Sequence, residues 1–357
     1  DQATHNAVGD TENTIPLAVN VLKTAAELFH IELSFSTCDF GGISLDRHGV
    51  PVQEGVLAAC RSADAVLLGA VGGPAWDQSD PALRPEAALL RLRSEMNAFA
   101  NLRPVKLYPA LQDASPLKNS LLEQGIDLLI IRELLGGIYF GKRGTAETHA
   151  FDTEQYDTVQ IERIVRKAFT AARGRRGKLC LVDKANVLES SRLWRKLFFQ
   201  LAEDYPDVEV SALYVDNAAM QLIRRPFDFD CIVTSNLFGD ILSDEAAVLT
   251  GSIGMLPSAS LDENDRGIYE PIHGSAPDIA GKGIANPIAT ILSAAMMLRF
   301  SFDLDKEADA VENAVKQVLK DKYRTIDIMP QEAERAGEVT QVGTSKMGDL
   351  ICERIQK

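Results

Sequence analysis

The sequence predicts an α/β protein built around a largely parallel sheet. Short apolar runs, several of them β-branched, at residues 65–70, 126–131, 179–182, 208–215 and 231–234 have the length and composition of buried strands. Between several of these runs lie segments whose apolar residues recur at the 3.6-residue period of a helix. Strands that alternate with helices are typical of folds in which helices cover a parallel sheet.

Helices are predicted where apolar residues recur every three or four positions. In residues 159–172 the buried stripe would consist of Ile161, Ile164, Val165, Ala168, Phe169 and Ala172. The same pattern predicts helices over 15–29 and 85–99, and the apolar segment 288–298 is predicted to be a core helix. The opening residues indicate only a weak strand at 6–8, and the tail is predicted to be polar helix and loop.

The chain has 357 residues, 46% of them hydrophobic, which predicts two domains or one large domain with a substantial core. Its formal net charge is −14 and its pI is about 4.9, which argues against a surface for nucleic acid or anionic membranes. The one basic cluster, residues 173–178, is predicted to be a solvated helix end.

The five cysteines are odd in number and show no CxxC spacing, which indicates free thiols in a reducing compartment. No apolar run approaches the length of a membrane span, and no signal peptide is evident. We therefore expect a soluble intracellular protein. It would be cytoplasmic, or would lie in an organelle matrix if a targeting segment before Asp1 has been removed.

The stretch 236–245, Asn-Leu-Phe-Gly-Asp-Ile-Leu-Ser-Asp-Glu, follows the predicted strand at 231–234 and leads into a helix. Asp240 and Asp244 are four residues apart, so on a helix that begins near Gly239 both carboxylates lie on one face. Two like charges this close are unfavourable unless a cation lies between them, and Mg²⁺ or Mn²⁺ accepts carboxylate ligands. The alternative is a helix start that favours acidic residues near its positive end.

Other charged side chains are predicted at the ends of elements, where ligand sites of open α/β sheets gather. Lys184 follows the strand at 179–182, and Asp216 follows the strand at 208–215. Three arginines at element ends could hold carboxylates through bidentate hydrogen bonds: Arg93, Arg103 and Arg132. The alternative for each arginine taken singly is a surface ion pair.

Two glycine-rich segments also contain candidate site residues. Tyr139 is flanked by residues that would bury its ring, so its hydroxyl needs a partner; core packing alone is the alternative. Small residues in 269–287 would let a ligand approach the backbone closely. Asp278 could accept both hydroxyls of a ribose, and its charge would repel a 2′-phosphate. No G-x-G-x-x-G occurs, so a Rossmann dinucleotide site is not expected.

Taken together, these motifs resemble the β-decarboxylating dehydrogenases of the isocitrate/isopropylmalate family. The resemblance runs from about Phe40 to about Met297 and rests on Gly69–Pro74, Asn101–Pro104, Arg132–Gly141, Val182–Leu188, Tyr214–Asn217, Phe238–Glu245, Gly251–Ser258 and Tyr269–Pro287. It implies a two-domain α/β fold, distinct from the Rossmann fold, with one sheet running through both domains. Residues 1–99 and 252–357 would form the cofactor-binding domain. Residues 100–251 would form the domain that carries the substrate, metal and dimer-interface residues.

The resemblance also implies a reaction: NAD-dependent, metal-assisted oxidative decarboxylation of 3-isopropylmalate to 4-methyl-2-oxopentanoate, a step of leucine biosynthesis. The active unit would be a homodimer with shared sites, in which Lys184 and Asp216 come from one subunit and Tyr139, Asp240 and Asp244 from the other. The three aspartates would ligate Mg²⁺ or Mn²⁺, which would polarise the ketone formed by oxidation. Neutral Lys184 would take the hydroxyl proton, and Tyr139 would protonate the enolate left when CO₂ departs.

The remaining site residues follow from the same resemblance. The malate carboxylates would be held by Arg93, Arg103 and Arg132, with Glu86 and Asp216 also at the substrate. The isopropyl group would contact Leu89, Leu90 and Val187, because burying an unpaired carboxylate among leucines costs more than an apolar contact contributes. The pair Asp278-Ile279 matches the pattern of members that use NAD. The cofactor would be bound by Gly254, Glu270, His273, Gly274, Ser275, Ala276, Asp278, Ile279 and Asn286.

The chain departs from the family in its first loop, residues 8–17. Members usually carry Gly-Asp-Gly-Ile-Gly-Pro-Glu near the nicotinamide end of the cofactor, whereas this chain has Gly-Asp-Thr-Glu-Asn-Thr-Ile from Gly9. Two alternatives remain open. One is the same chemistry on another 2-hydroxy diacid, such as homoisocitrate or tartrate/malate. The other is a catalytically impaired subunit that binds ligand or regulates a partner, which only the altered loop supports.

Overall fold

The computed structural model describes residues 2–7, 14–76, 78, 80–330 and 337–355. The altered first loop therefore lies largely outside the described residues, which resume at Thr14. Contacts within the chain divide it into two compact units. Unit 1 comprises Asp1–Ala98, Tyr108–Ser115 and Thr250–Lys357, and unit 2 comprises Phe99–Leu107 and Pro116–Leu249. Each unit combines helices with a mainly parallel sheet, so the predicted α/β class is confirmed.

The sheet of unit 1 contains β1 (Gln2–Ala7), β2 (Phe35–Phe40), β3 (Ala65–Leu68), β11 (Pro257–Leu261) and β12 (Gly267–Pro271). Its strand order is β2-β1-β3-β12-β11, and neighbours are parallel except β11, which runs antiparallel to β12. Every residue of β3, β11 and β12 is buried, which explains why β3 and β11 consist of apolar or small residues. β12 also buries the charged residue Glu270.

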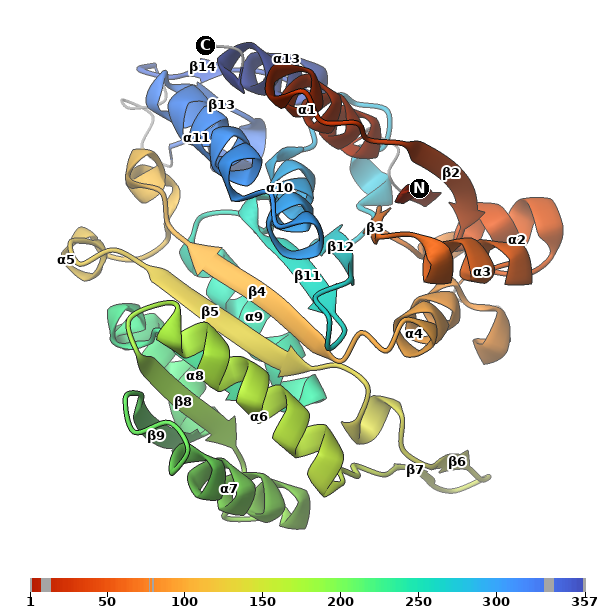
Figure 1. Ribbon diagram of the computed structural model, residues 1–357, viewed down its shortest axis with the longest axis vertical. Coiled ribbons are helices and arrows are strands. Elements are labelled where there is room, and N and C mark those ends of the chain that lie inside the picture. The colour runs from red at the N-terminus through yellow and green to blue at the C-terminus, as the bar shows by residue number, and fades with distance from the viewer. Residues whose placement is uncertain (1, 8–13, 77, 79, 331–336, 356–357) are drawn as a thin grey trace. The chain divides into compact units, whose positions relative to one another are not determined.

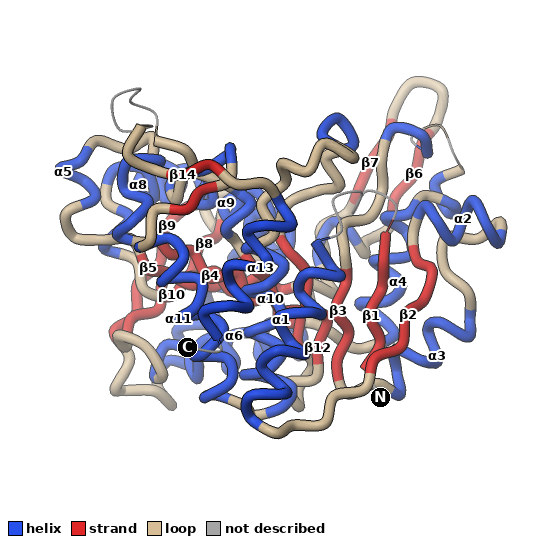
Figure 2. Tube along the Cα trace, turned by 90° about the horizontal axis from the view of Figure 1, so that it is seen from above, coloured by secondary structure: helices blue, strands red, loops and turns tan. Residues whose placement is uncertain are grey.

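Four helices of unit 1 lie together (Figures 1 and 2): α1 (Thr14–Phe29), α10 (Ile288–Phe302), α11 (Asp305–Lys320) and α13 (Thr344–Ile355). Residues 288–298 of α10 are all buried, which confirms the predicted core helix. The tail was predicted to be polar helix and loop. This is only partly correct, because α11 buries an apolar stripe that includes Val311, Val315 and Val318. The unit also contains α2 (Gly42–His48), α3 (Glu54–Ser62), α4 (Pro85–Glu95) and the strand pair β13 (Tyr323–Arg324) and β14 (Thr340–Gln341).

The helix predicted over 85–99 ends early, at Glu95. Asn97 has a φ of 48°, a left-handed conformation with which an α-helix cannot continue. The chain then extends into β4 (Ala100–Lys106). Arg103 therefore lies in the middle of a strand, and its predicted position at an element end is wrong.

The sheet of unit 2 contains β4, β5 (Asp127–Glu133), β8 (Lys178–Asp183), β9 (Glu209–Tyr214) and β10 (Cys231–Thr234). Its order is β4-β5-β10-β8-β9, with β4 antiparallel to β5 and the others parallel. Helices α6 (Thr158–Arg173) and α7 (Glu189–Ala202) cover one face, and α8 (Val215–Arg224) and α9 (Asn236–Leu249) cover the other (Figure 1). The unit also contains the short helix α5 (Asn119–Leu122) and a hairpin of β6 (Arg143–Thr145) and β7 (Ala150–Asp152).

The basic cluster at the end of α6 is a solvated helix end only in part: Arg173, Arg176 and Lys178 are exposed, whereas Arg175 is half-buried. Arg175 donates from Nε to Asp230 Oδ1 at 2.9 Å and from Nη2 to Asp127 Oδ1 at 2.7 Å. The backbone N–H of Arg176 donates to Asp230 Oδ2 at 2.8 Å. The Asp230 side chain is fully buried, so these contacts compensate a carboxylate that would otherwise be costly to place there.

All five cysteines are free thiols. Cys60, Cys180 and Cys231 are buried, and burial raises the pKa of Cys60 and of Cys231 to about 12, so both thiols stay protonated at neutral pH. Within the described part of the chain, no helix is long and apolar enough to cross a membrane.

Candidate active site

Most residues predicted to bind the cofactor surround one cavity of about 530 Å³ in unit 1. Predicted residues that line it are Gly254, His273, Gly274, Ser275, Ala276, Ile279 and Asn286. Its volume lies within the range of roughly 300–1,000 Å³ that is typical of small-molecule pockets. The Nε2 atom of His273 is buried and makes no hydrogen bond to the described residues, so a polar group of a ligand could complete its hydrogen bonding.

Other residues of this cavity were not predicted, among them Ser252, Ile326 and Asp327. Asp327 accepts hydrogen bonds at Oδ2 from Asn286 Nδ2, at 3.0 Å, and from Ser252 Oγ. A Cβ on Gly254 would lie 2.9 Å from Asn286 Cβ and 3.0 Å from Asp327 Oδ2, so glycine permits this close packing. Asp327 and its neighbour Ile326 lie in a tail without a recognisable motif, and only the fold brings them to the cavity.

Two predicted cofactor residues do not line this cavity. Asp278 is exposed in the short turn Pro277–Ile279, directly before a residue that does. Glu270 is buried on β12 and accepts a hydrogen bond from Arg93 Nη2 at 2.7 Å. Arg93, predicted for the substrate, is itself 7% exposed, so the surface ion pair considered for it is wrong.

The residues predicted for the isopropyl group belong to different units. Leu89 and Leu90 of α4 are half-buried in unit 1, where Leu89 packs against the apolar core, and Glu86 of the same helix is exposed. Val187 belongs to unit 2 and is 61% exposed. Their joint role in specificity stays a prediction.

In unit 2, four predicted residues gather around the carboxylate of Asp240. Arg132 Nη1 donates to Asp240 Oδ1 at 2.5 Å, and the Tyr139 hydroxyl donates to Oδ2 at 2.8 Å. Arg103 Nη2 lies 3.4 Å from Asp240 Oδ1, and its Nη1 lies 3.5 Å from Asp244 Oδ1. Arg103 and Arg132 are 6% and 2% exposed, so neither is the surface ion pair considered as an alternative.

Local structure explains this grouping. Asp240 and Asp244 lie one turn apart on α9, which begins at Asn236 rather than near Gly239. No acidic residue lies in the first turn of α9, so the alternative of a simple acidic helix start is wrong. A Cβ on Gly239 would lie 2.7 Å from Arg132 Cβ, and its absence lets the arginine lie across the helix.

Burial shifts two ionisable groups of this cluster. Burial, and then hydrogen bonding to Asp240, raises the pKa of the Tyr139 phenol, so the hydroxyl stays protonated at neutral pH. Burial also raises the pKa of Asp244, and the positive charge of Arg103 partly offsets this shift. The site therefore combines guanidinium groups, carboxylates and a phenol that can donate a proton.

Lys184 and Asp216 form a second pair in unit 2. Lys184 directly follows β8, and its Nζ lies 2.8 Å from Asp216 Oδ1. Asp216 lies two residues after β9 ends, in the first turn of α8, which agrees with its predicted position after that strand. The hydrogen bond from Lys184 lowers the pKa of the Asp216 carboxyl, so it is charged at neutral pH.

Within the described part of one chain, no group of three His, Cys, Asp or Glu side chains is placed to hold a metal ion. Asp216 therefore does not join Asp240 and Asp244 in one ligand group of a single chain. The predicted ligand set would have to be completed across a dimer.

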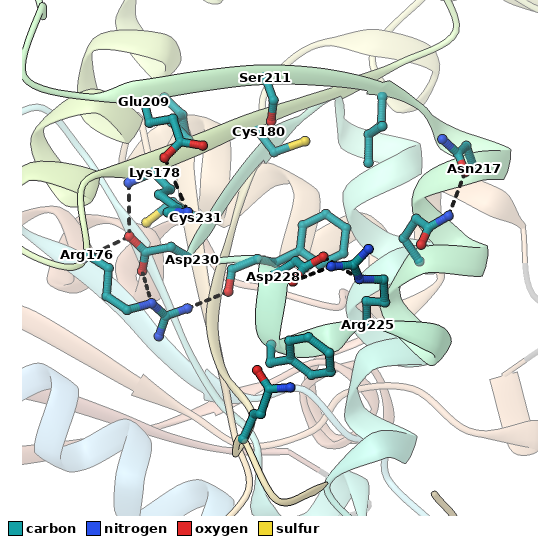
Figure 3. Close-up of a pocket in the computed structure, with 16 residues that line it drawn as sticks. Arg176, Lys178, Cys180, Glu209, Ser211, Asn217, Arg225, Asp228, Asp230 and Cys231 are labelled. Carbon is teal, nitrogen blue, oxygen red and sulfur yellow. Dashed lines mark hydrogen bonds and ion pairs between the residues drawn. The ribbon is translucent and has the colours of Figure 1, made fainter. Parts of the chain in front are cut away.

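A second cavity of about 740 Å³ lies in unit 2, between the first residues of β8, β9 and β10 and helix α8 (Figure 3). Cations at its rim are paired with acids: Lys178 with Glu209 at 3.2 Å and Arg225 with Asp228 at 2.7 Å. None of the predicted site residues is among the described residues that line it.

Known proteins share both the sequence and the fold. The family model described as isocitrate/isopropylmalate dehydrogenase matches residues 6–351. A 3-isopropylmalate dehydrogenase of Pseudomonas fluorescens is 56% identical over 345 residues, which are 95% of this chain and 94% of the relative. One of Clostridium pasteurianum is 52% identical over 342 residues, with the same coverage of 95% and 94%.

A solved structure of an isocitrate dehydrogenase from Methylococcus capsulatus has a TM-score of 0.86 and 31% identity, covering 100% of this chain and 99% of that chain. A β-decarboxylating dehydrogenase of Thermococcus kodakarensis has a TM-score of 0.79 and 33% identity, covering 99% and 96%. These matches extend over nearly the whole chain and agree with the motifs quoted above. The chain therefore belongs to the isocitrate/isopropylmalate dehydrogenase family and is a β-decarboxylating dehydrogenase.

Proposed function

We propose that this enzyme oxidises and decarboxylates 3-isopropylmalate, with NAD⁺ as the oxidant and a divalent cation at the site. The products would be 4-methyl-2-oxopentanoate, CO₂ and NADH. The observation that carries the proposal is the grouping of Arg103, Arg132 and Tyr139 around Asp240. The names of the relatives support the choice of substrate and its place in leucine biosynthesis.

Arg103 and Arg132 would bind the substrate carboxylates. Both side chains are nearly fully buried, so their charges are screened little by water and favour an anionic ligand. Guanidinium groups suit carboxylates because two parallel N–H donors match the two carboxylate oxygens.

The acidic residues fit a hard cation in their chemistry. Asp240 and Asp244 present carboxylate oxygens on one face of α9, and such oxygens are the ligands that a hard cation prefers. The guanidinium group of Arg103 beside them is a hydrogen-bond donor and could not itself ligate the cation. Asp216 of a second subunit would complete the set with Mg²⁺ or Mn²⁺. When bound, the cation would polarise the C2 oxygen and stabilise negative charge on it.

The protein's own residues would move the protons. In its neutral form, the Lys184 amine would take the proton of the C2 hydroxyl as hydride leaves for NAD⁺, and would become the ammonium. The Asp216 carboxylate, 2.8 Å from Nζ, holds the amine in place. After CO₂ departs, the Tyr139 hydroxyl would donate a proton to the enolate carbon, which yields the 2-oxo acid.

The cavity in unit 1 is our candidate for the NAD site. Its apolar wall suits an adenine ring, and His273 Nε2, which has no hydrogen-bond partner among the described residues, could hydrogen-bond to the ring or to a neighbouring polar group. Asp278 is exposed directly before the cavity residue Ile279, where its carboxylate could accept the two ribose hydroxyls.

Asp278→Arg should shift the cofactor preference towards NADP. The variant loses the acceptor for the ribose hydroxyls and places a cation where a 2′-phosphate would lie. We expect the ratio of kcat/KM for NADP to that for NAD to rise by about tenfold or more, about 1.4 kcal/mol. Glu263→Arg, an exposed acid in the turn between β11 and β12, is the control for added charge. An unchanged ratio in Asp278→Arg would count against the ribose assignment.

The enzyme is proposed to act as a homodimer through α8 and α9, which pack together in unit 2. Large apolar side chains on these helices are exposed: Met220 54%, Ile223 46%, Ile241 58% and Val248 59%. Covering them with a second copy would remove apolar area from water, which favours association.

Charges on this surface should separate the subunits. In Ile241→Lys/Val248→Lys, like charges would meet across the two-fold interface, and we expect the dimer to bind at least about 30-fold more weakly, about 2 kcal/mol. Sedimentation velocity would show a monomer, and activity would fall with it because Lys184 and Asp216 would come from the partner. Val159→Lys on α6, 69% exposed, is the matched control. A stable, active dimer of the double variant would exclude this interface.

The direct test of the function is NADH production from 3-isopropylmalate, with and without Mn²⁺. We expect turnover that requires the cation and exceeds turnover of homoisocitrate, tartrate or malate. Preference for an acid without an alkyl branch would reassign the substrate. Binding of ligands without any turnover would favour the impaired homologue.

The five free thiols support a cytoplasmic or other reducing compartment.

A further inference from the structure

Asn236, the first residue of α9, is fully buried beside the Asp240 cluster and was not among the predicted site residues. Its Oδ1 accepts hydrogen bonds from Arg132 Nε at 3.0 Å and from Arg132 Nη2 at 2.7 Å. Arg132 Nη1 is thereby directed to Asp240, one helical turn along α9. Asn236 and Asp240 hold the same guanidinium from two successive turns of one helix.

The other half of the Asn236 amide holds the turn that leads to Tyr139. Its Nδ2 donates to the carbonyl oxygens of Leu134, at 3.1 Å, and of Gly136, at 3.0 Å. Tyr139 follows three residues later and donates to Asp240. One side chain thus fixes both the arginine and the turn that carries the proposed proton donor.

Neighbouring groups hold the same turn and the first residue of α9. The buried carboxylate of Glu133 accepts from the backbone N–H of Leu135 at 3.1 Å and of Gly136 at 2.7 Å. The Tyr156 hydroxyl accepts from the backbone N–H of Asn236 at 2.9 Å. A Cβ on Gly136 would lie 2.6 Å from the Tyr156 ring, so the turn packs directly on it.

We propose that Asn236 is a positioning residue for both Arg132 and Tyr139. The inference rests on the proposed function, because it assigns these two residues to substrate binding and proton donation. Only an amide at this position can accept twice and donate twice. A carboxylate would keep the contacts to Arg132 but would face two carbonyl oxygens without a proton to donate. The two halves of the amide can therefore be tested separately.

Asn236→Asp should keep Arg132 in place and release the turn. We expect kcat to fall by about 10- to 100-fold, while KM for 3-isopropylmalate stays within about threefold of the wild type. Asn236→Ala removes both halves, so KM should also rise, by about tenfold or more. Thr234→Val is the matched control, because it removes a buried hydrogen bond to the Val182 carbonyl just before α9.

A readout without turnover separates this inference from the proposed function. Hydrogen–deuterium exchange of the ligand-free protein should show faster exchange at amides 135–141 in both Asn236 variants, and not in Thr234→Val. If the wild type fails to oxidise 3-isopropylmalate, the proposed function fails. Hydrogen–deuterium exchange still tests whether Asn236 holds the turn that leads to Tyr139. If Asn236→Ala does not fold, the exchange and kinetics of the nearly isosteric Asn236→Asp test the inference. Unchanged exchange, or equal loss in Asn236→Asp and Thr234→Val, would overturn the inference.

Discussion

Lys184→Met should nearly abolish hydride transfer while the protein stays folded. Methionine keeps an unbranched side chain that is one atom shorter than lysine, and it lacks the only atom that could accept the hydroxyl proton in our mechanism. General-base catalysis contributes about 10²- to 10⁴-fold, so we expect kcat to fall by about that factor. Rapid mixing with NAD⁺, Mn²⁺ and 3-isopropylmalate should show no burst of NADH. Mn²⁺ binding should be largely intact, because Asp216, Asp240 and Asp244 are unchanged.

The stability of this variant should change little. Asp216 is 64% exposed, so water can solvate its carboxylate when the Lys184 ammonium is gone. Lys178→Met is the matched control, because Lys178 lies at the opposite end of β8 and pairs with the exposed Glu209. Full activity in Lys184→Met would refute the assignment of the base. A similar loss in both variants would point to a general effect of removing a lysine from β8.

Residues with strong local patterns could be predicted from the sequence. The four-residue spacing of Asp240 and Asp244 places them on one face of any helix, whatever the helix packs against. The buried strands before Lys184 and Arg132 are short apolar runs, and chain order alone places those residues at strand ends. Such predictions depend on near neighbours in the chain, and tertiary packing seldom overrides them.

Other features depend on contacts between distant segments. No pattern in the tail marks Asp327, and its role comes from the return of this segment to Asn286. Arg175 seemed solvated because its acidic partner, Asp230, lies far along the sequence. Asn236 was part of a motif, but its importance lies in bonds to Arg132 and Gly136 that no spacing rule predicts.

Tyr139→Phe should separate the two proton transfers. The phenol of Tyr139 has a raised pKa and stays protonated beside Asp240, as a proton donor at neutral pH requires. Without this hydroxyl, hydride transfer can still proceed through Lys184, but the enolate loses its proton donor. We expect steady-state kcat to fall by about 10²- to 10⁴-fold. A burst of one NADH per site should survive in rapid-mixing experiments.

The surviving burst is the decisive measurement, because Lys184→Met and Tyr139→Phe would show equally low steady-state rates for different reasons. Only a residue that acts after hydride transfer can be removed without losing the first NADH. Tyr205→Phe is the matched control, since this tyrosine stacks on Phe169 of α6, the helix that covers the sheet face opposite α9. If the burst also disappears in Tyr139→Phe, the phenol acts before or during hydride transfer. Its proposed role would then change from proton donor to a group that orients Asp240.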